Sequence, residues 1–372
     1  MGTEPLDSQK ILVTGGLGYI GSHVAKRLAS LGHHVGIFDN ISSGCAGRLA
    51  SIRASSSGNV EFVMGDIRNQ MDLTAAFDWF RPEAVIHLAG QKVIERSFEN
   101  PELFHSTNVA GTSSVLQAAS SFGCHRVIFS SSASVYGKQL VPPVRENAAL
   151  FPLSPYGETK ILGEQCVRDW VASNSFERSA AMLRYFNPCG CEASLIKGEA
   201  NSNADLSLSE KLVLVALNRQ RFLEVLGTDH PTSDGSPVRD FIHRNDVVEA
   251  HVAALKAIQR QSFCEAVNVG TGEGTSVLQF VRKFEDISGI KIQLRRLPRA
   301  PADLSASKAD TAKSRRVMSW RAQYGLDEIC RNLWNAVSVK IQKQKTDLEV
   351  GTLDYKGSSA QDSLELVRYR NG

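Results

Sequence analysis

A glycine-rich turn near the start of the chain most limits the folds open to it. The segment Thr14–Gly21, TGGLGYIG, directly follows the apolar run Ile11–Val13 and opens a helical pattern. Glycines at 15, 18 and 21 allow a tight turn, close approach of the backbone to a phosphate group, and close packing of a helix on a strand. The helix then points unpaired N–H groups and its positive dipole end at the anion. The pattern predicts a strand–turn–helix unit that binds the pyrophosphate of a dinucleotide.

Short β-branched runs alternate with helix-length stretches, which is typical of a parallel sheet covered by helices. The runs are apolar at consecutive positions, as strands buried on both faces should be. The predicted strands are Ile11–Thr14, Val35–Asp39, Val60–Met64, Ala84–Leu88, Arg126–Ser131 and Ala180–Phe186. The predicted helices lie near residues 20–31, 71–80, 101–122 and 155–174. We therefore expect an α/β fold with a doubly wound Rossmann-type parallel sheet.

The regular alternation of predicted strands and helices ends after Asn187. A polar stretch at 188–207 indicates a long loop, and helices near 208–219 and 246–259 and strands at VRDFIH and AVNVG follow. The expected organisation is a leader at 1–9, a Rossmann-type dinucleotide-binding domain at 10–187 to which later segments can return, a smaller α/β substrate-binding lobe at 188–338, and a flexible tail at 339–372, where periodicity is lost.

Composition excludes several classes of protein. The 372 residues are 42% hydrophobic and carry a net charge of +3. This excess of positive charge is too small to indicate binding to nucleic acid. No apolar run approaches the ~20 residues of a membrane span, and the first ten residues lack the pattern of a signal peptide. The seven cysteines are scattered, with only Cys189 and Cys191 close together, so we predict reduced packing residues and no metal site. A cytoplasmic protein is expected.

The end of the second predicted strand indicates which dinucleotide binds. A carboxylate at Asp39 can accept hydrogen bonds from the adenosine ribose and would repel a 2′-phosphate. The next residues are Asn40 and Ile41, and the first arginine is Arg48. NAD(H) is therefore favoured over NADP(H), with Asp66, after the third strand, placed to reach the adenine edge.

A second pattern, Tyr156-Gly157-Glu158-Thr159-Lys160, lies in the helical stretch after the fifth strand. A spacing of four places Tyr156 and Lys160 on one helical face. A tyrosine titrates at about 10 unperturbed, so it needs nearby positive charge to act as a base at neutral pH. An ammonium group one turn away and an oxidised nicotinamide would supply that charge. The upstream segment SSSASVYG, residues 130–137, offers hydroxyls that could share a substrate proton.

Together these segments resemble the extended short-chain dehydrogenase/reductases and, within them, the UDP-glucose 4-epimerases. The matching signatures are TGGLGYIGSH, DN at 39–40, GDI at 65–67, HLAGQK at 87–92, SSSASVYG, PYGETK, LRYFNPCG and DGSPVRDFIHRNDVVEAHVAAL. The similarity runs from about Lys10 to about Val337, and VRDFIH with the long match in the second half is specific to the nucleotide-sugar branch.

The resemblance implies an NAD-dependent interconversion of UDP-glucose and UDP-galactose. The sugar is oxidised at C4 to a 4-keto intermediate, turns within the site, and is reduced again on its opposite face. In this mechanism Tyr156 removes the 4-hydroxyl proton, Ser132 assists, and Lys160 lowers the pKa of the tyrosine and holds the nicotinamide ribose. A homodimer with a four-helix contact between the helices near 101–122 and 155–174 is also implied. On the latter helix, apolar surface for both core and partner would come from Ile161, Leu162, Val167 and Trp170.

The resemblance also assigns the binding residues. Cofactor contacts are expected at Gly15, Gly18, Tyr19, Ile20, Gly21, Asp39, Asn40, Asp66, Ile67, Leu88, Ala89, Gly90, Lys92, Asn108, Ser130, Tyr156, Lys160 and Tyr185. Substrate contacts are expected at Lys92, Ser132, Tyr156, Phe186, Asn187, Ser207, Leu208, Arg239, Asp303 and Ser307. Arg239 would pair with the diphosphate, and Ser307 falls at the gate beside the C2 substituent. Because serine is small, the N-acetylhexosamine pair is predicted to react as well.

Three segments of the lobe depart from the family pattern. The Asn-Asn-Leu segment reads Leu206-Ser207-Leu208, the RRxGD segment reads Arg299-Ala300-Pro301-Ala302-Asp303, and GAH reads Gly190-Cys191-Glu192. The first change removes two amides and the second removes one phosphate-contacting arginine, for which Arg295, Arg296 or Arg299 would have to compensate. Redox chemistry is therefore better supported than the identity of the sugar.

Three alternatives stay open. A 4,6-dehydratase would need an acidic pair beside the serine of strand five, where Ala133 and Ser134 stand. A UDP-uronate 4-epimerase or decarboxylase shares similar serine-rich strands. A non-catalytic NAD-binding scaffold or sensor would fit the altered lobe, although Ser132, Tyr156 and Lys160 are intact.

Overall fold

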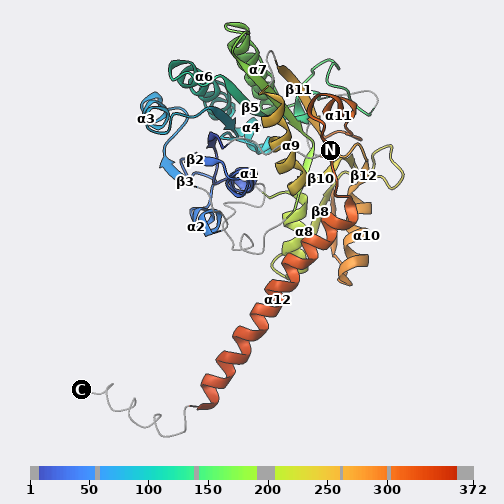
Figure 1. Ribbon diagram of the computed structural model, residues 1–372. Helices are drawn as coiled ribbons and strands as arrows, with labels where there is room; N and C mark the ends of the chain where they lie inside the picture. The colour runs from blue at the N-terminus through green and yellow to red at the C-terminus, as the bar shows by residue number, and fades with distance from the viewer. Residues whose placement is uncertain are drawn as a thin grey trace, which may run out of the picture.

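A seven-stranded parallel sheet forms the centre of the computed structural model, with helices on both faces (Figure 1). The structure describes residues 8–54, 59–137, 142–190, 206–259, 263–299 and 303–357. The strand order is β11-β6-β5-β4-β1-β2-β3. The strands are β1 (Lys10–Thr14), β2 (His34–Asp39), β3 (Val60–Met64), β4 (Ala84–His87), β5 (Arg126–Ser132), β6 (Ser179–Tyr185) and β11 (Cys264–Val269). The doubly wound α/β fold predicted from the sequence is confirmed.

Apolar residues at consecutive positions in β1 serve both faces of the sheet. Ile11 and Val13 enter one core with helices α1 and α9, and Leu12 enters the other with α3, α6 and α7. All three side chains are fully buried. The helices around the sheet are α1 (Tyr19–Ser30), α2 (Gly47–Ala54), α3 (Gln70–Phe80), α4 (Ile94–Glu99), α5 (Pro101–His105), a π-helical turn (Ser106–Ala110), α6 (Gly111–Ser121), α7 (Pro155–Ala172), α9 (Arg244–Ala257) and α11 (Ala312–Met318).

The second half of the chain builds a smaller lobe with its own apolar core. Its elements are β7 (Asn187–Cys189), α8 (Leu208–Ala216), β8 (Leu223–Leu226), β9 (Val238–Arg239), β10 (Phe241–His243), β12 (Thr275–Ser276), α10 (Val277–Ser288), β13 (Leu294–Leu297) and α12 (Leu326–Gly357). The strands pair as β10-β7, β12-β9 and β13-β8. Both α8 and α10 begin with a capping box, Ser207 with Glu210 and Ser276 with Gln279, which satisfies N–H groups that a helix start leaves unpaired.

Later segments return to the large sheet. β11 pairs with β6 from Cys264 opposite Ala180 to Val269 opposite Tyr185. Helix α9 shares the core of α1. The two halves of the chain are therefore interleaved rather than joined end to end.

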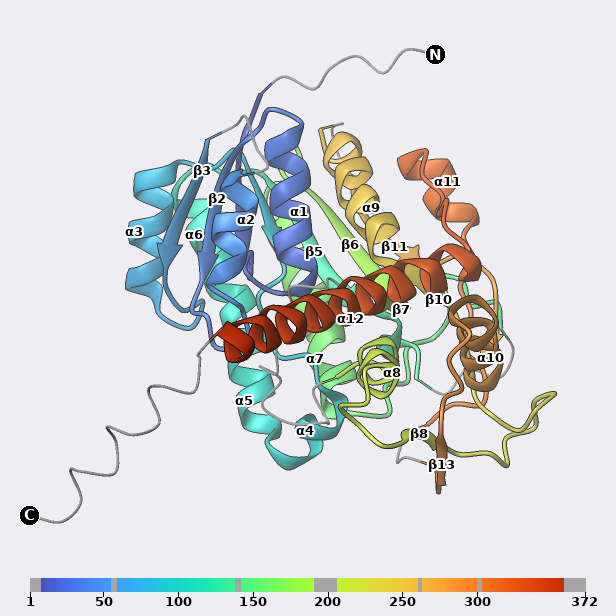
Figure 2. The same cartoon turned by 90° about the horizontal axis from the view of Figure 1, so that it is seen from below.

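Helix α12 differs from the expectation of a flexible tail from residue 339. It continues to Gly357 and projects away from the sheet (Figures 1 and 2). The stretch 340–349, KIQKQKTDLE, contains no proline or glycine and is rich in good helix formers, so local propensity extends the helix after the apolar periodicity stops. Residues 358–372 lie outside the described part of the chain. Within that part, no helix is both long and apolar enough to cross a membrane.

Candidate active site

The glycine turn joins β1 to α1 at the carboxyl edge of the sheet. Gly15 has a positive φ of 69°, and a methyl group there would lie 2.6 Å from the backbone nitrogen of Ala89, so only glycine fits. Gly18 caps α1 without a side-chain hydrogen bond, and the first turn of α1 carries no acidic residue. The N–H groups at this helix start are thus left without a side-chain acceptor. This cradle fits the pyrophosphate of a dinucleotide.

Asp39 lies directly beneath this turn. Its Oδ2 accepts a hydrogen bond from Leu17 N at 2.9 Å, and its Oδ1 accepts one from Ile41 N at 2.7 Å. Arg48, distant from Asp39 in the sequence, is brought close, but its Nη1 donates to the Leu17 carbonyl at 2.6 Å. The Arg48 guanidinium therefore stabilises the glycine turn.

Asp66 has partners of its own at the neighbouring strand end. Its carboxylate accepts from Arg68 Nη2 at 2.6 Å and from Asn40 Nδ2 at 3.0 Å. These hydrogen bonds, that of Arg68 above all, hold the pKa of Asp66 at about 2. The structure brings Asn40 and Asp66 together, as predicted for one end of the cofactor site, while a contact of Asp66 with adenine stays a prediction. Ile67, the next residue, is buried in the core.

The loop after β4 faces the same edge. Asn108 clamps it, because its Oδ1 accepts from Gln91 N at 2.7 Å and its Nδ2 donates to Gln91 O at 3.0 Å. A methyl group on Gly90 would lie 2.8 Å from Asn108 Oδ1. Lys92 Nζ lies 5.9 Å from the centre of the Tyr19 ring. The predicted cofactor residues Leu88, Ala89, Gly90, Lys92 and Asn108 are thus close to the glycine turn, and Leu88 N donates to Thr14 O at 3.0 Å.

Ser132, Tyr156 and Lys160 meet where β5 ends and α7 begins. Ser154 caps α7 by accepting from Gly157 N, and Pro155 occupies the first turn, so the helix starts just before Tyr156. Ser132 Oγ donates to Ser134 Oγ at 3.1 Å, and the Ser132 hydroxyl is near enough to the Tyr156 phenol to lower its pKa. Lys160 Nζ donates to Ser130 O at 2.9 Å and lies 5.7 Å from the centre of the Tyr156 ring. The three residues predicted to be catalytic therefore form one cluster.

Burial dominates the electrostatics of this cluster. It raises the pKa of the Tyr156 phenol, and the Ser132 hydroxyl only partly opposes the shift. It also lowers the pKa of the Lys160 ammonium to about 8, against the charge of Glu164. In the chain alone the phenol is thus neutral at pH 7, and the predicted lowering of its pKa by Lys160 is not evident. A functioning base here needs added positive charge, which an oxidised nicotinamide carries.

Tyr185 and Phe186 extend the cluster from the end of β6. The Tyr185 hydroxyl lies 2.7 Å from His251 Nε2 and is hydrogen-bonded to Ser130. Burial lowers the pKa of His251 to about 4, so this histidine is neutral at pH 7. Phe186 is buried and packs on Tyr136, with ring centres 6.4 Å apart.

In the smaller lobe, the structure groups Arg239, Asp303 and Ser307. Arg239 forms an ion pair with Asp303 and donates to Leu304 O at 2.7 Å. Ser307 N donates to Val238 O at 3.0 Å, beside Arg239. Burial lowers the pKa of Arg239, although Asp303 opposes the shift. The guanidinium that the sequence assigns to a diphosphate is therefore already paired with a carboxylate.

The other predicted lobe residues have local structural partners. Asn187 N donates to Asp240 O at 3.0 Å, which joins β7 to the segment carrying Arg239. Ser207 caps α8, and Leu208 packs against the core of the lobe. Arg299, one of the possible compensating arginines, pairs with Asp229 at 2.8 Å. The altered positions Ala300, Pro301, Ala302, Cys191 and Glu192 lie outside the described residues.

Comparisons with known proteins agree with this arrangement. A family model described as GDP-mannose 4,6 dehydratase matches residues 12–333. The chain is 40% identical over 334 residues to a bifunctional UDP-glucose 4-epimerase and UDP-xylose 4-epimerase of Pisum sativum, which covers 88% of this chain and 95% of that protein. A UDP-glucose 4-epimerase of Oryza sativa subsp. japonica is 40% identical and is covered over 90% of its length. The chain belongs to the UDP-glucose 4-epimerase family.

Solved members of the family share the fold. A UDP-glucose 4-epimerase from Stenotrophomonas maltophila, with bound NAD and formylated UDP-arabinopyranose, has a TM-score of 0.84 and 36% identity, covering 90% of this chain and 99% of its own. The enzyme from Bifidobacterium longum, in complex with NAD+ and UDP, has a TM-score of 0.83 and 31% identity, covering 89% and 98%. The resemblance inferred from the sequence is confirmed.

Two features of this family member escaped the sequence analysis. Glu164 on α7 bonds Arg184 on β6, with Oε2 to Nη2 at 2.7 Å, and it accepts from Ser131 Oγ at 2.6 Å. The Arg184 Nη1 in turn donates to the Tyr136 hydroxyl at 3.0 Å. This buried network ties together the two elements that carry the candidate catalytic residues. Its only signal in the sequence is a charged residue inside each of two apolar segments.

The second feature is Arg244, the first residue of α9. Only 6% of it is exposed, yet its Nε and Nη1 have no hydrogen-bond partner. A methyl group on Gly190 would lie 3.3 Å from Arg244 Cβ, and Gly190 O accepts from the Tyr19 hydroxyl at 2.7 Å. A buried guanidinium with two unpaired nitrogens, close to a glycine that is bonded to the first turn of α1, adds to the case that this region holds an anion.

No metal centre is evident. Among the residues described, no group of three or more His, Cys, Asp and Glu side chains could hold a metal ion. The cysteines at 45, 124, 166, 189, 264 and 330 are free thiols, and burial raises the pKa of Cys124 to about 12.

Proposed function

We propose that the chain is an NAD-dependent UDP-hexose 4-epimerase that interconverts UDP-glucose and UDP-galactose. The observation that carries the proposal is the cluster of Ser132, Tyr156 and Lys160 at the same sheet edge as the glycine cradle and Asp39. The relatives at about 40% identity, all named for this activity, support it.

The proposed residues divide the chemistry between them. When bound, NAD supplies the acceptor and later the donor of the hydride at C4 of the sugar. The Tyr156 phenolate takes the proton from the 4-hydroxyl and gives it back after the sugar has turned, as a general base and then a general acid. Ser132, which acts to lower the pKa of that phenol, would share the proton with it. Lys160, with its Nζ fixed by Ser130 O, supplies positive charge on the same helical face.

The smaller lobe is proposed to hold the nucleotide sugar. Arg239 would donate to the diphosphate, and Asp303 keeps its guanidinium oriented through their ion pair. Asn187, on the strand paired with β10, would contact the sugar-nucleotide from the opposite side of this segment. Ser307 would face the C2 substituent.

Two other reactions remain as alternatives. The family model carries the name of a 4,6-dehydratase, but Ala133 and Ser134 form a short 3-10 turn with no carboxylate for the elimination step. A UDP-uronate 4-epimerase or decarboxylase is favoured by one similar structure, a protein in complex with UDP-glucuronic acid and NAD, at 26% identity and a TM-score of 0.75. Its lower identity places it second.

The deciding experiment separates the C4 epimers formed from each substrate. Purified protein is incubated in parallel with UDP-galactose, UDP-glucuronate and UDP-xylose, and the products are separated and identified by mass. We expect conversion of UDP-galactose to UDP-glucose, and release of NAD(H) with almost no NADP(H) on denaturation. Turnover of UDP-glucuronate alone would establish the alternative, and turnover of no substrate by NAD-loaded protein would favour a scaffold.

A homodimer and a cytoplasmic location are part of this proposal. Three exposed apolar side chains, Ile94, Phe98 and Leu162, lie on the mutually packed helices α4 and α7. Free thiols at six described cysteines are typical of a reducing compartment.

A further inference from the structure

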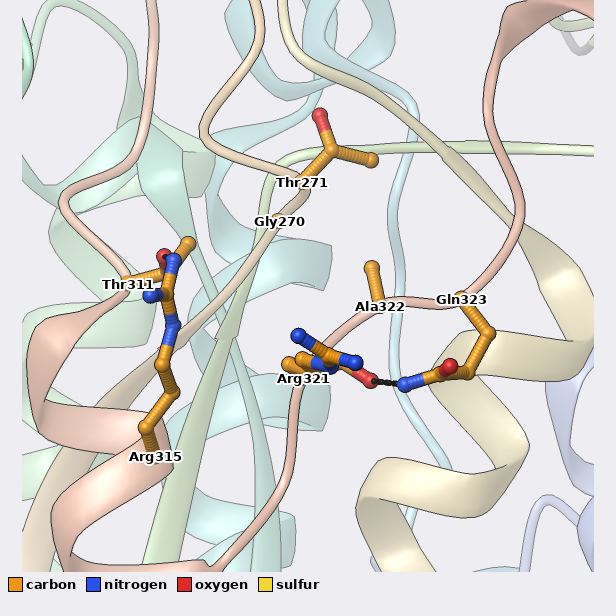
Figure 3. Close-up of a pocket in the computed structure, with 7 residues that line it drawn as sticks. All are labelled: Gly270, Thr271, Thr311, Arg315, Arg321, Ala322 and Gln323. Atoms are coloured by element: carbon orange, nitrogen blue, oxygen red, sulfur yellow. Dashed lines mark hydrogen bonds between the residues drawn. The ribbon is translucent and has the colours of Figure 1, made fainter.

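A hollow of about 330 Å³ lies beside the edge strand of the large sheet, and none of its lining residues belongs to the candidate active site. It is enclosed by the turn after β11, the start of α11 and the segment that follows α11 (Figure 3). The lining residues are Gly270, Thr271, Thr311, Arg315, Arg321, Ala322 and Gln323.

Two guanidinium groups make this hollow cationic. Arg315 and Arg321 line it from different segments, and Arg315 Nη2 donates to the Thr311 hydroxyl at 2.9 Å (Figure 3). Within the described part of the chain, neither guanidinium forms an ion pair with a carboxylate. Neither guanidinium is thus in direct contact with a carboxylate, although the charge of Arg315 contributes to lowering the pKa of Asp310.

The neighbouring carboxylates are already engaged. Asp310 pairs with Arg145 at 3.0 Å. Asp246 accepts from the backbone nitrogens of Gln323 and Tyr324 at 2.9 and 3.0 Å. Each of these acids has partners closer at hand than the two arginines, so the hollow keeps its positive potential.

A second hollow of about 500 Å³ shares Arg315, Arg321 and Gln323 as walls but is also lined by Asp246 and Glu249. Those carboxylates would repel an anion. The first hollow has no acidic residue in its lining. An anion drawn by the two arginines would accordingly bind on the side of Thr271 and Thr311.

The donors match one class of ligand. Planar guanidinium forks bind phosphate oxygens in pairs, through charge-assisted hydrogen bonds. The hydroxyl of Thr311 and the amide of Gln323 add neutral polar groups to the lining. The volume is at the lower end of the about 300–1,000 Å³ typical of small-molecule sites. We propose that this hollow is a second binding site that takes a phosphate monoester of a small metabolite.

The proposed site adjoins the smaller lobe through a single carboxylate. Thr271 donates to Asp240 Oδ1 from its backbone nitrogen at 2.8 Å and from its hydroxyl at 2.6 Å. Asp240 directly follows Arg239, and its Oδ2 accepts from Ala309 N at 3.1 Å. Thr271 therefore links the lining of the hollow to the carboxylate that fixes the segment around Arg239.

Calorimetric titration of the full chain tests this proposal. The protein is first saturated with UDP, so that a nucleotide-sugar site is filled, and is then titrated with glucose 1-phosphate or with inorganic phosphate. We expect one equivalent of glucose 1-phosphate to bind, and Arg321→Gln to weaken it about ten- to a hundredfold, as for loss of one charge-assisted hydrogen bond. Arg315→Gln should weaken it to a similar degree.

The matched control is Arg316→Gln, which removes the same charge from the next residue of α11, outside the lining. It should bind like the wild type, and circular dichroism should show all three variants folded. Absence of binding to the wild type at millimolar ligand, or equal weakening in Arg316→Gln, would overturn the proposal. Equally tight binding of inorganic phosphate would overturn its assignment to a monoester.

Discussion

Tyr156 experiences two opposing influences on its acidity. Burial raises the pKa of the phenol, and the Ser132 hydroxyl lowers it. The Tyr156→Phe variant keeps the ring that packs against Phe104 but loses the ionisable oxygen. Turnover of UDP-galactose should therefore fall about 10²–10⁴-fold, the usual contribution of general acid–base catalysis. Steady-state kinetics would measure it.

The control for this prediction is Tyr324→Phe. Tyr324 is 38% exposed and stacks on His243, apart from the catalytic cluster. It should keep wild-type turnover. Near-normal turnover in Tyr156→Phe would refute the assignment of the base.

The predicted range of UDP-sugar substrates depends on Ser307. Its backbone nitrogen is bonded to Val238 O at 3.0 Å, beside the guanidinium proposed for the diphosphate. A small side chain there leaves room for an acetamido group at C2, so the wild type should interconvert UDP-N-acetylglucosamine and UDP-N-acetylgalactosamine. Ser307→Tyr should abolish this activity and spare the simple hexoses, as separation of the epimers would show. A wild type that rejects acetylated sugars, or a tyrosine variant that still accepts them equally well, would contradict the gate.

At the level of elements, the ion pair of Glu164 and Arg184 joins α7 to β6. Burial pushes the pKa of Glu164 up, but the hydrogen bonds and charge of Arg184 outweigh it and hold the pKa below its usual value. Glu164→Gln leaves a buried guanidinium without its counter-charge, so the free energy of unfolding should drop by about 3–5 kcal/mol. Urea denaturation at pH 7 would measure the loss.

The pH dependence of this effect has a definite sign. Because the folded pKa of Glu164 is depressed, its stabilisation is complete above the unfolded pKa and disappears as the pH falls through the folded value. The gap between wild type and Glu164→Gln should therefore narrow on acidification. Glu158→Gln, on the exposed side of the same helix, is the control and should change stability little. A constant gap across the acid range would contradict this account.

The sequence predicted those elements whose pattern of apolar residues reflects their burial in the fold. All six strands of the first half formed where apolar runs served both faces of the sheet, as in β1. The two-residue strand β12 had no such pattern and forms through its pairing with β9, which lies within the predicted strand VRDFIH. The π-helical turn Ser106–Ala110 interrupts what the sequence presented as one continuous helix.

Partnerships between distant residues were the least predictable part of the site. The glycine turn, Asp39 and the Tyr156–Lys160 spacing are local patterns with a local physical meaning. Arg239 was identified, but its ion pair with Asp303 depends on a loop 64 residues along the chain. Arg244 lies close to Gly190, 54 residues earlier in the chain, and no feature of its neighbours in the sequence indicates this.

At the scale of the whole molecule, α7 has apolar side chains on two faces. Val167 and Trp170 lie in the core of the sheet, 0% and 7% exposed, so they are not free for a partner. Leu162 is 42% exposed, and Phe98 on the adjoining α4 is 48% exposed. Of the apolar residues predicted on α7 for core and partner, Val167 and Trp170 thus serve the core, and Leu162 is left for the proposed dimer surface.

Light scattering at micromolar concentration should accordingly give the mass of two chains. A carboxylate introduced by Leu162→Asp would have to be buried unpaired against the second copy, which costs far more than leaving it in water, so this variant should shift toward the mass of one chain. Met71→Asp is the matched control, because Met71 is 78% exposed on α3, a helix outside the proposed contact, and its mass should not change. A wild type that scatters as one chain would refute the dimer. An unaltered dimer in Leu162→Asp would place the contact on another face, because a single buried charge at the centre of an apolar interface is enough to separate it.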